Sequence, residues 1–438
     1  ITLTATATDD FTVGIDGQTV TFTDFNSASL SGADGDDDIS VTSLAGFTTT
    51  VTVAGDSPTG TTGDTLHVEG TAAGETIAVT ANTITVGGAG AITYGTVESL
   101  SLDAAGGTDT ITVTGSTAYD YTPGGSVDTG SLLADSLPIS FSNLGAGETL
   151  DLDGTSLVAH ASGSDNTFVL GANLTVDGRV NITRTNLTTL TLDGLAGDDT
   201  FTIGSGHGYT TVNLDGGSPS NTDVATITGD GANAVTVTLG TSPVSTTDAT
   251  VANTGLGTVN LSGVEVANVV AGTQDVTVNG SDEDDNLTYQ PTGAEAGTVT
   301  KAGLGVVTNL SGVGGLTIDV AAGTDQVTVL GNVSDNTISV VRGANTSVTV
   351  DALQSADIVT ASTEQLLISA GRGVDIIALS GTGGPELTID GGGNGLGGFG
   401  LNGDILSITN TNLGTTTVFT GSTPDSGDIE TPDTANNT

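Results

Sequence analysis

The chain lacks cysteine, methionine and tryptophan, and only five of its 438 residues are lysine or arginine. Without cysteine it forms no disulfide and offers no thiolate to a metal. Five cations do not make the basic surface that phosphate neutralisation requires, so we expect no nucleic-acid binding. No apolar run approaches the roughly 20 residues of a membrane helix, so we also expect no membrane insertion.

Carboxylates dominate the charge of the chain. The 51 aspartate and glutamate residues give a formal net charge of −46. A compact fold with this imbalance repels itself. Bound divalent ions, high salt or low ambient pH would each relieve the repulsion; calcium is one explanation, and adaptation to high salt is its main rival. An acidic chain without cysteine fits a secreted protein on a cell surface. The absence of a first methionine fits a chain from which a leader has been removed, although a trimmed expression product would also begin without methionine.

Apolar residues alternate with threonine through most of the chain, as at Val51 and Val53, Ile111 and Val113, and Val235 and Val237. Alternation of this kind is typical of strands that bury one face, and no stretch has helical periodicity. The sequence therefore predicts an all-β fold. Plentiful glycine, short strands and scarce aromatics favour a parallel β-solenoid of tandem repeats, in the manner of a β-helix. The alternative is a string of tandem β-sandwich domains.

Internal repetition is the strongest signal in the sequence. The segments 32–40, 194–202 and 370–378 align with one another, and a second matching piece follows each about twenty residues later. We expect a tandem array that is cut out of phase at both ends. Its parts are a partial repeat over 1–30, repeat 1 over 31–192, repeat 2 over 193–368, a truncated repeat 3 over 369–414, and a flexible or intermolecular tail over 415–438.

The repeated turn has the pattern Gly-x-x-Gly-x-Asp-x-apolar, as in GLAGDDTFT (194–202), with looser matches at 104–112 and 320–328. It resembles the calcium-binding nonapeptide of the repeats-in-toxin (RTX, hemolysin-type) family, and the chain looks like the acidic, Thr/Gly/Asp-rich repeat proteins of bacterial surfaces. The resemblance implies calcium held by carboxylate and carbonyl oxygens. It assigns the ligand role to Asp37, Asp109, Asp199, Asp325 and Asp375.

This sequence departs from the family because its turns stand alone instead of following one another directly. A calcium site would have to be completed by another loop, for instance the cluster of Asp34, Asp36 and Asp38 or that of Asp282, Asp284 and Asp285, and Asp198 is a further candidate ligand. The alternative is that Gly-x-Asp turns only connect strands, because glycine and aspartate are the residues that tight turns require.

Catalysis finds little support in the sequence. The single lysine and four arginines do not cluster, no nucleophile motif is present, and the three histidines occupy different repeat phases. We expect His207, in a glycine-rich loop, to be solvated. The chain is therefore not expected to be an enzyme, although a carbohydrate-active β-helix is a third possibility.

The repeats, the charge and the resemblance together predict an extracellular structural protein. We expect a calcium-stabilised subunit that assembles with copies of itself into a filament, sheath or surface layer. The alternative is a stalk or adhesin segment of a larger surface protein, whose partner would be a cell-surface glycan.

Overall fold

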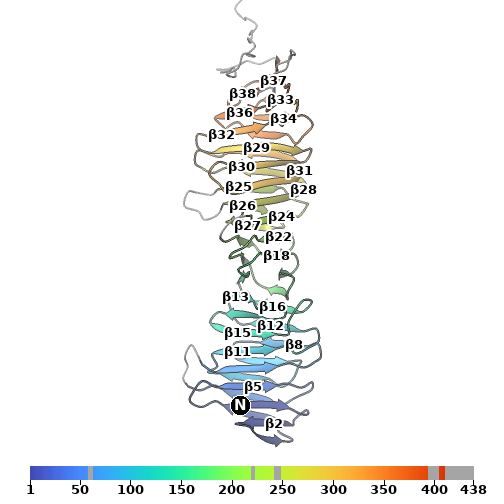
Figure 1. Cartoon of the computed structure of the whole chain (residues 1–438), viewed down its shortest axis with the longest axis vertical. Helices are drawn as coiled ribbons and strands as arrows, with labels where there is room; N and C mark the ends of the chain where they lie inside the picture. The colour runs from blue at the N-terminus through green and yellow to red at the C-terminus, as the bar shows by residue number, and fades with distance from the viewer. Residues whose placement is uncertain (58–62, 219–221, 241–247, 393–403, 410–438) are drawn as a thin grey trace, which may run out of the picture. The chain divides into compact units, whose positions relative to one another are not determined.

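The computed structural model describes residues 1–57, 63–218, 222–240, 248–392 and 404–409 (Figure 1). These residues form strands and no helix. No helix capable of crossing a membrane therefore occurs in the described part of the chain. The chain divides into two compact units: unit 1 comprises Ile1–Thr226 and Gly255–Glu265, and unit 2 comprises Ile227–Thr254 and Val266–Thr438. The boundary at Thr226 falls within the residue range of strand β24 (Val224–Thr228).

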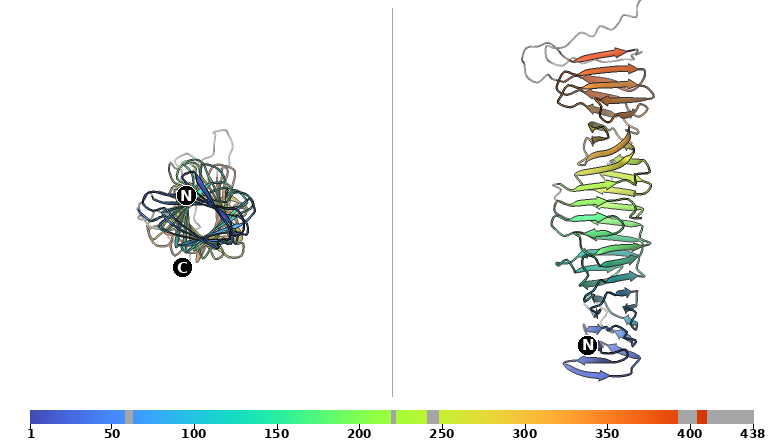
Figure 2. Two further views of the ribbon diagram at one scale, coloured as in Figure 1. Left: turned by 90° about the horizontal axis from the view of Figure 1, so that it is seen from below. Right: turned by 90° about the vertical axis from the view of Figure 1, so that its right-hand side faces the viewer.

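Unit 1 is built from parallel stacks of short strands, which Figure 2 shows layered from blue to green. The first stack is β1 (Thr2–Ala5), β5 (Asp38–Thr42), β7 (Thr65–Glu69), β11 (Ser99–Asp103) and β15 (Leu137–Ser142). The second is β8 (Thr76–Val79), β12 (Thr110–Thr114), β16 (Thr149–Asp153) and β20 (Asn181–Thr185). The others are β4 (Ser27–Ser31), β6 (Thr50–Ala54) and β10 (Ile92–Gly95); β13 (Ala118–Pro123), β17 (Ser156–His160), β21 (Thr189–Asp193), β23 (Thr211–Asp215) and β27 (Gly257–Ser262); and β18 (Thr167–Leu170) with β22 (Thr200–Ile203).

The alternating sequence explains these stacks. In most of these strands the apolar residues point inward and the threonines outward, because side chains along a strand alternate between its two faces. Ile39, Leu66 and Leu100 are in register in β5, β7 and β11, and each is at most 1% exposed. Burying one such side chain stabilises the fold by roughly 1.5–3 kcal/mol. Columns of aliphatic side chains from successive coils thus form the core of the unit.

Antiparallel hairpin strands interrupt the parallel stacks. In unit 1 they are β2 (Phe11–Ile15), β3 (Gln18–Phe22), β9 (Thr83–Val86), β14 (Gly130–Ala134) and β19 (Leu174–Val176). Strand β9 pairs with β8 on one side and β10 on the other, and β14 and β19 join their neighbours in the same way. Each of these three meanders connects a strand of one stack to a strand of another.

Unit 2 repeats the same arrangement. Its parallel stacks are β25 (Val235–Leu239), β28 (Val266–Asn279), β31 (Val307–Asp319) and β35 (Ala356–Val359); β29 (Asn286–Gly293), β32 (Gln326–Leu330), β36 (Gln365–Ser369) and β38 (Glu386–Asp390); and β33 (Thr337–Arg342), β37 (Ile376–Gly381) and β39 (Ile405–Thr409). Its hairpin strands are β26 (Ala249–Asn253), β30 (Ala296–Lys301) and β34 (Asn345–Val350).

The predicted all-β solenoid is confirmed. The alternative of tandem β-sandwiches is wrong, because sandwiches are built from antiparallel sheets whereas the pairing between coils here is parallel. The long repeats seen in the sequence each span several coils, and their predicted boundaries stay a prediction. The predicted tail over 415–438 lies outside the described residues.

Candidate functional site: a ladder of buried carboxylates

The five turns that share the Gly-x-Asp pattern also share one backbone conformation. The residue four positions before the key aspartate has a positive φ in every case, from 63° at Ala321 to 97° at Gly371. The glycine two positions before it has a φ between 128° and 152°, a region that side chains rarely tolerate. The sequence repeat therefore encodes one turn, which ends immediately before a core strand.

In these turns the key aspartate points into the fold and bonds to the neighbouring coil. In unit 1, Asp199 Oδ1 accepts the Asn166 backbone N–H (2.8 Å), and the Asp199 N–H donates in turn to Asp223 Oδ1 (2.6 Å). The Asp223 N–H donates to Glu265 Oε2 (2.7 Å). Each carboxylate thus satisfies a turn amide that would otherwise be buried without a partner. We call this column of linked residues the carboxylate ladder.

The same interaction recurs along both units. In unit 1, the backbone N–H of Asp37 donates to the Asp64 carboxylate (2.7 Å), that of Asp64 to the Glu98 carboxylate (2.8 Å), and that of Glu75 to the Asp109 carboxylate (2.8 Å). In unit 2, the backbone N–H groups of Asp285, Asp325, Asn336 and Asp375 donate in the same way. Their acceptors are the carboxylates of Asp325 (2.7 Å), Glu364 (2.8 Å), Asp375 (2.7 Å) and Asp404 (2.9 Å), respectively. Three series of linked residues run from an aspartate through a second aspartate to a glutamate, so the ladder is a repeated structural element.

One oxygen of each of seven ladder carboxylates, the five key aspartates among them, has no hydrogen-bond partner among the described residues. These atoms are Oδ2 of Asp37, Asp64, Asp109, Asp199, Asp223, Asp325 and Asp375. The conformation of the turn explains why this oxygen has no partner among the residues described. At Asp199, the amide of Leu195 bonds instead to Asp193 Oδ1 (3.2 Å), because the positive φ of Leu195 turns that amide away. At Asp285, by contrast, the corresponding amide of Ser281 reaches Oδ2 (2.6 Å).

At Asp37 and Asp199 the unpartnered oxygen lies over a glycine five residues earlier in the chain, Gly32 and Gly194. A Cβ added to Gly194 would lie 2.5 Å from Asp199 Oδ2 and 2.7 Å from the carbonyl oxygen of Gly216. Both distances are shorter than real Cβ contacts, so only glycine leaves room for the carboxylate here. The two oxygens face the same small space, and both are acceptors, which favours a proton or a cation between them.

Burial raises the pKa of five ladder carboxyl groups. It raises the pKa of Asp199 to about 6, and the nearby carboxylates Asp223 and Asp165 add to the effect while the Asn166 N–H opposes it. The pKa values of Asp109, Asp223, Asp325 and Asp375 are also raised, again chiefly by burial. Burial therefore disfavours the charged form of these five carboxyl groups.

The structure separates the predicted calcium ligands into two groups. Asp109, Asp199, Asp325 and Asp375 are at most 1% exposed and bond to turn amides, and Asp37, which is half-buried, belongs to the same ladder. The neighbours Asp34, Asp36, Asp38 and Asp198 are exposed. Calcium takes six to eight oxygens, whereas each of the five aspartates in the first group has one buried oxygen without a hydrogen-bond partner in the described part of the chain. Calcium binding by these nine residues stays a prediction.

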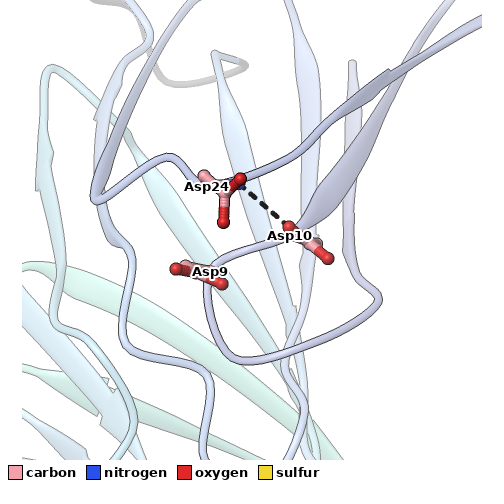
Figure 3. A group of neighbouring side chains, drawn as sticks. All are labelled: Asp9, Asp10 and Asp24. Carbon is pink, nitrogen blue, oxygen red and sulfur yellow. Dashed lines mark hydrogen bonds between the residues drawn. The ribbon is translucent and has the colours of Figure 1, made fainter.

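A different acidic cluster meets the distance requirement for a metal site. Asp9 and Asp10, between β1 and β2, lie beside Asp24, which follows β3, and one oxygen from each lies within 4.8 Å of the others (Figure 3). The Asp24 N–H donates to Asp10 Oδ1 (3.0 Å), which holds the two loops together. Sequence reasoning missed this cluster because it has no glycine pattern and its third member is distant in sequence.

Two histidines contact other functional groups. His160 lies between two carboxylates, with Nε2 3.0 Å from Asp120 Oδ1 and Nδ1 2.8 Å from Asp193 Oδ2. His207 was expected to be solvated, and this is wrong, since it is only 3% exposed. Its Nδ1 accepts the Tyr209 N–H (3.0 Å), and burial together with the Arg184 guanidinium lowers its pKa. The glycines around His207 allow the loop to fold its imidazole inward.

No protein-family profile matches this sequence, and no curated protein matches it either. The resemblance to the RTX repeats accordingly rests on the turn sequences alone.

Proposed function

We propose that the chain is the shaft of an extracellular structural protein, which assembles with copies of itself into a filament, sheath or surface layer. The carboxylate ladder is the observation that carries this proposal. Each turn is completed by a carboxylate of the next coil, so one interaction is repeated along a unit. An architecture of this kind is extended by adding further coils.

The edge of unit 1 at β3 supports self-association. Strand β3 pairs with β2 on one side, and no strand pairs with its other side among the described residues. Ile15, Val20 and Phe25 lie at this end and are 47–55% exposed. An open strand edge with apolar residues is a template for pairing with another chain. A second copy is the partner that we propose.

Calcium is the ion that we propose for the acidic turns. The unpartnered ladder oxygens and the exposed carboxylates beside them are hard ligands of the type that calcium prefers. An ion bound there would also reduce the mutual repulsion of the carboxylates. We place the protein outside the cell because its surface is acidic and its covalent structure does not depend on cysteine.

Light scattering and electron microscopy of the purified chain, with calcium and then with a chelator, test this function. We expect ordered assemblies with calcium and their loss in chelator. Val20→Lys should prevent assembly, because it places a charge on the β3 edge. Val127→Lys is the matched control, since Val127 is 68% exposed at a different place. Monomers under every condition would contradict the structural role.

A shallow groove favours the second candidate function, a stalk or adhesin segment that binds a glycan. It has a volume of about 210 Å³ and lies on the outer face of β5, β7, β11 and β15. Its polar lining consists of Ser40, Thr42, His67, Glu69, Ser101, Asp103 and Ser142. Hydroxyl and carboxylate groups are suitable partners for sugar hydroxyls. A monomeric chain that binds glycans, with binding lost in His67→Ala, would favour this function.

A further inference from the structure

The only lysine of the chain lies largely buried in unit 2. Lys301 ends β30, where it pairs with Leu287 of β29 in an antiparallel hairpin. Its Nζ contacts Asp285 Oδ1, and the two side chains are 11% and 0% exposed. A buried lysine beside a buried carboxylate is costly to keep as separate ions, because both groups have lost their hydration. A reaction that removes both the ammonium and the carboxylate charge is therefore favoured at this position.

The surrounding atoms provide what such a reaction needs. Lys301 Nζ donates to Ser281 Oγ (2.7 Å), and Ser281 Oγ donates to Asp285 Oδ1 (3.0 Å). The Ser281 hydroxyl thus links the ammonium to the carboxylate as a proton relay. The Ser281 backbone N–H donates to Asp285 Oδ2 (2.6 Å). A donor at this oxygen stabilises the negative charge that develops when a nucleophile adds to the carboxyl carbon.

We propose that Lys301 and Asp285 form an intramolecular amide (isopeptide) bond between Nζ and Cγ. A proton passes from the ammonium through the Ser281 hydroxyl to Oδ1, which leaves a neutral amine and a carboxylic acid. The nitrogen lone pair then attacks Cγ, and the electron pair of the carbonyl moves to Oδ2. As the nitrogen gives up a further proton to Oδ1, that oxygen leaves as water and the carbonyl re-forms.

The step balances without any further reactant. One C–N bond forms, one C–O bond breaks, one water molecule leaves, and no atom changes oxidation state. Proximity supplies much of the rate, because two groups held in contact react as one molecule. Burial also disfavours the reverse reaction, since hydrolysis requires water at Cγ. In a chain without cysteine, this bond is a covalent cross-link that its residues can form.

Lys301 has a side chain that can act as a nucleophile, whereas the four arginines do not. A guanidinium stays protonated and is a poor nucleophile, whereas a lysine that has given up a proton presents an amine lone pair. Three of the arginines bond to carbonyl oxygens instead: Arg179 to those of Gly124 and Ser126, Arg184 to those of His207 and Leu187, and Arg342 to that of Pro385. Ser281 is only 9% exposed, so its hydroxyl is held in the relay position.

Mass spectrometry of the denatured full-length chain tests the proposal. We expect a mass lower than that of the sequence by one water, and a branched peptide in a digest that joins Lys301 to Asp285. Lys301→Arg keeps the positive charge but should restore the full sequence mass. Ser281→Ala should lower the cross-linked fraction in freshly synthesised protein by tenfold or more, on the order expected for a lost proton relay.

Two results would overturn this assignment. The first is a wild-type mass equal to that of the sequence in protein whose circular dichroism is that of folded β-structure. The second is a loss of water that persists in Lys301→Arg, which would place the dehydration at another residue. The wild-type measurement decides the question by itself if a variant does not fold.

Discussion

Replacing Asp199 by asparagine should stabilise the chain at neutral pH. The amide retains an oxygen for the Asn166 N–H and introduces an NH₂ group beside the Gly216 carbonyl oxygen, where Asp199 Oδ2 has no partner among the described residues. Asparagine already occupies a ladder position at Asn166 and Asn336, where its Oδ1 accepts an N–H from its own turn. The substitution therefore fits the site.

The expected gain follows from the pKa of Asp199. Burial raises this pKa to about 6, above the value near 4 of an unfolded chain. A raised folded pKa means that the stabilisation is complete below about pH 4 and is lost as pH rises through 6. The loss corresponds to about 3 kcal/mol at most. Asp199→Asn should recover roughly 1–3 kcal/mol at about pH 7.5 and nothing at about pH 4.

Urea unfolding in chelator at these two pH values measures the difference, and hydrogen exchange of the Asn166 amide reports it locally. Asp198→Asn is the control, because this exposed neighbour should change stability by less than about 0.5 kcal/mol. Asp199→Ala should instead destabilise the chain by about 1–3 kcal/mol, since it leaves the Asn166 N–H unsatisfied. An Asp199→Asn variant that is less stable than wild type at about pH 7.5 would refute the reasoning.

Further predictions concern the packing around the ladder and a group with the opposite pH dependence. Gly194→Ala should cost about 1–3 kcal/mol in urea unfolding, because its Cβ would collide with Asp199 Oδ2. Gly163→Ala, which meets nothing within 4 Å, should cost less than about 0.5 kcal/mol. The lowered pKa of His207 gives stability that is present above about pH 6.5 and lost as pH falls. His207→Gln, which keeps an acceptor for the Tyr209 N–H, should remove the His207 contribution, so that its melting temperature falls less than that of the wild type between about pH 7 and pH 5; an unchanged acid decline would contradict this.

The sequence predicts the strands better than the ladder. Alternation placed Val51 and Val53 on an inward face, and both are 1% exposed. The Gly-x-Asp pattern also identified a real recurring turn. It did not show where the aspartate points, because the same turn suits a carboxylate directed toward an ion or toward the next coil. The partner amide is distant in sequence, 24 residues away for Asp199 and Asp223.

The remaining ladder members carry no local signal. Glu98, Glu265 and Glu364 accept the last amide of their columns, but no glycine pattern marks them. The spacing between rungs changes with the hairpins inserted into each coil, and it is 42 residues from Asp223 to Glu265. The coils therefore differ in length, and no fixed sequence period marks them. The contacts of His160 with Asp120 and Asp193 depend on the same stacking and were equally hidden.

The direction of the ladder bonds has a consequence for how the chain folds as it is synthesised. In each ladder bond described, the N–H belongs to the earlier coil and the carboxylate to the later one, as from Asp37 to Asp64 and from Asp325 to Glu364. The newest coil to leave the ribosome therefore holds a turn amide that is not yet paired. Its pairing waits for the next few dozen residues, so coils should become protected from hydrogen exchange in order from the N-terminus.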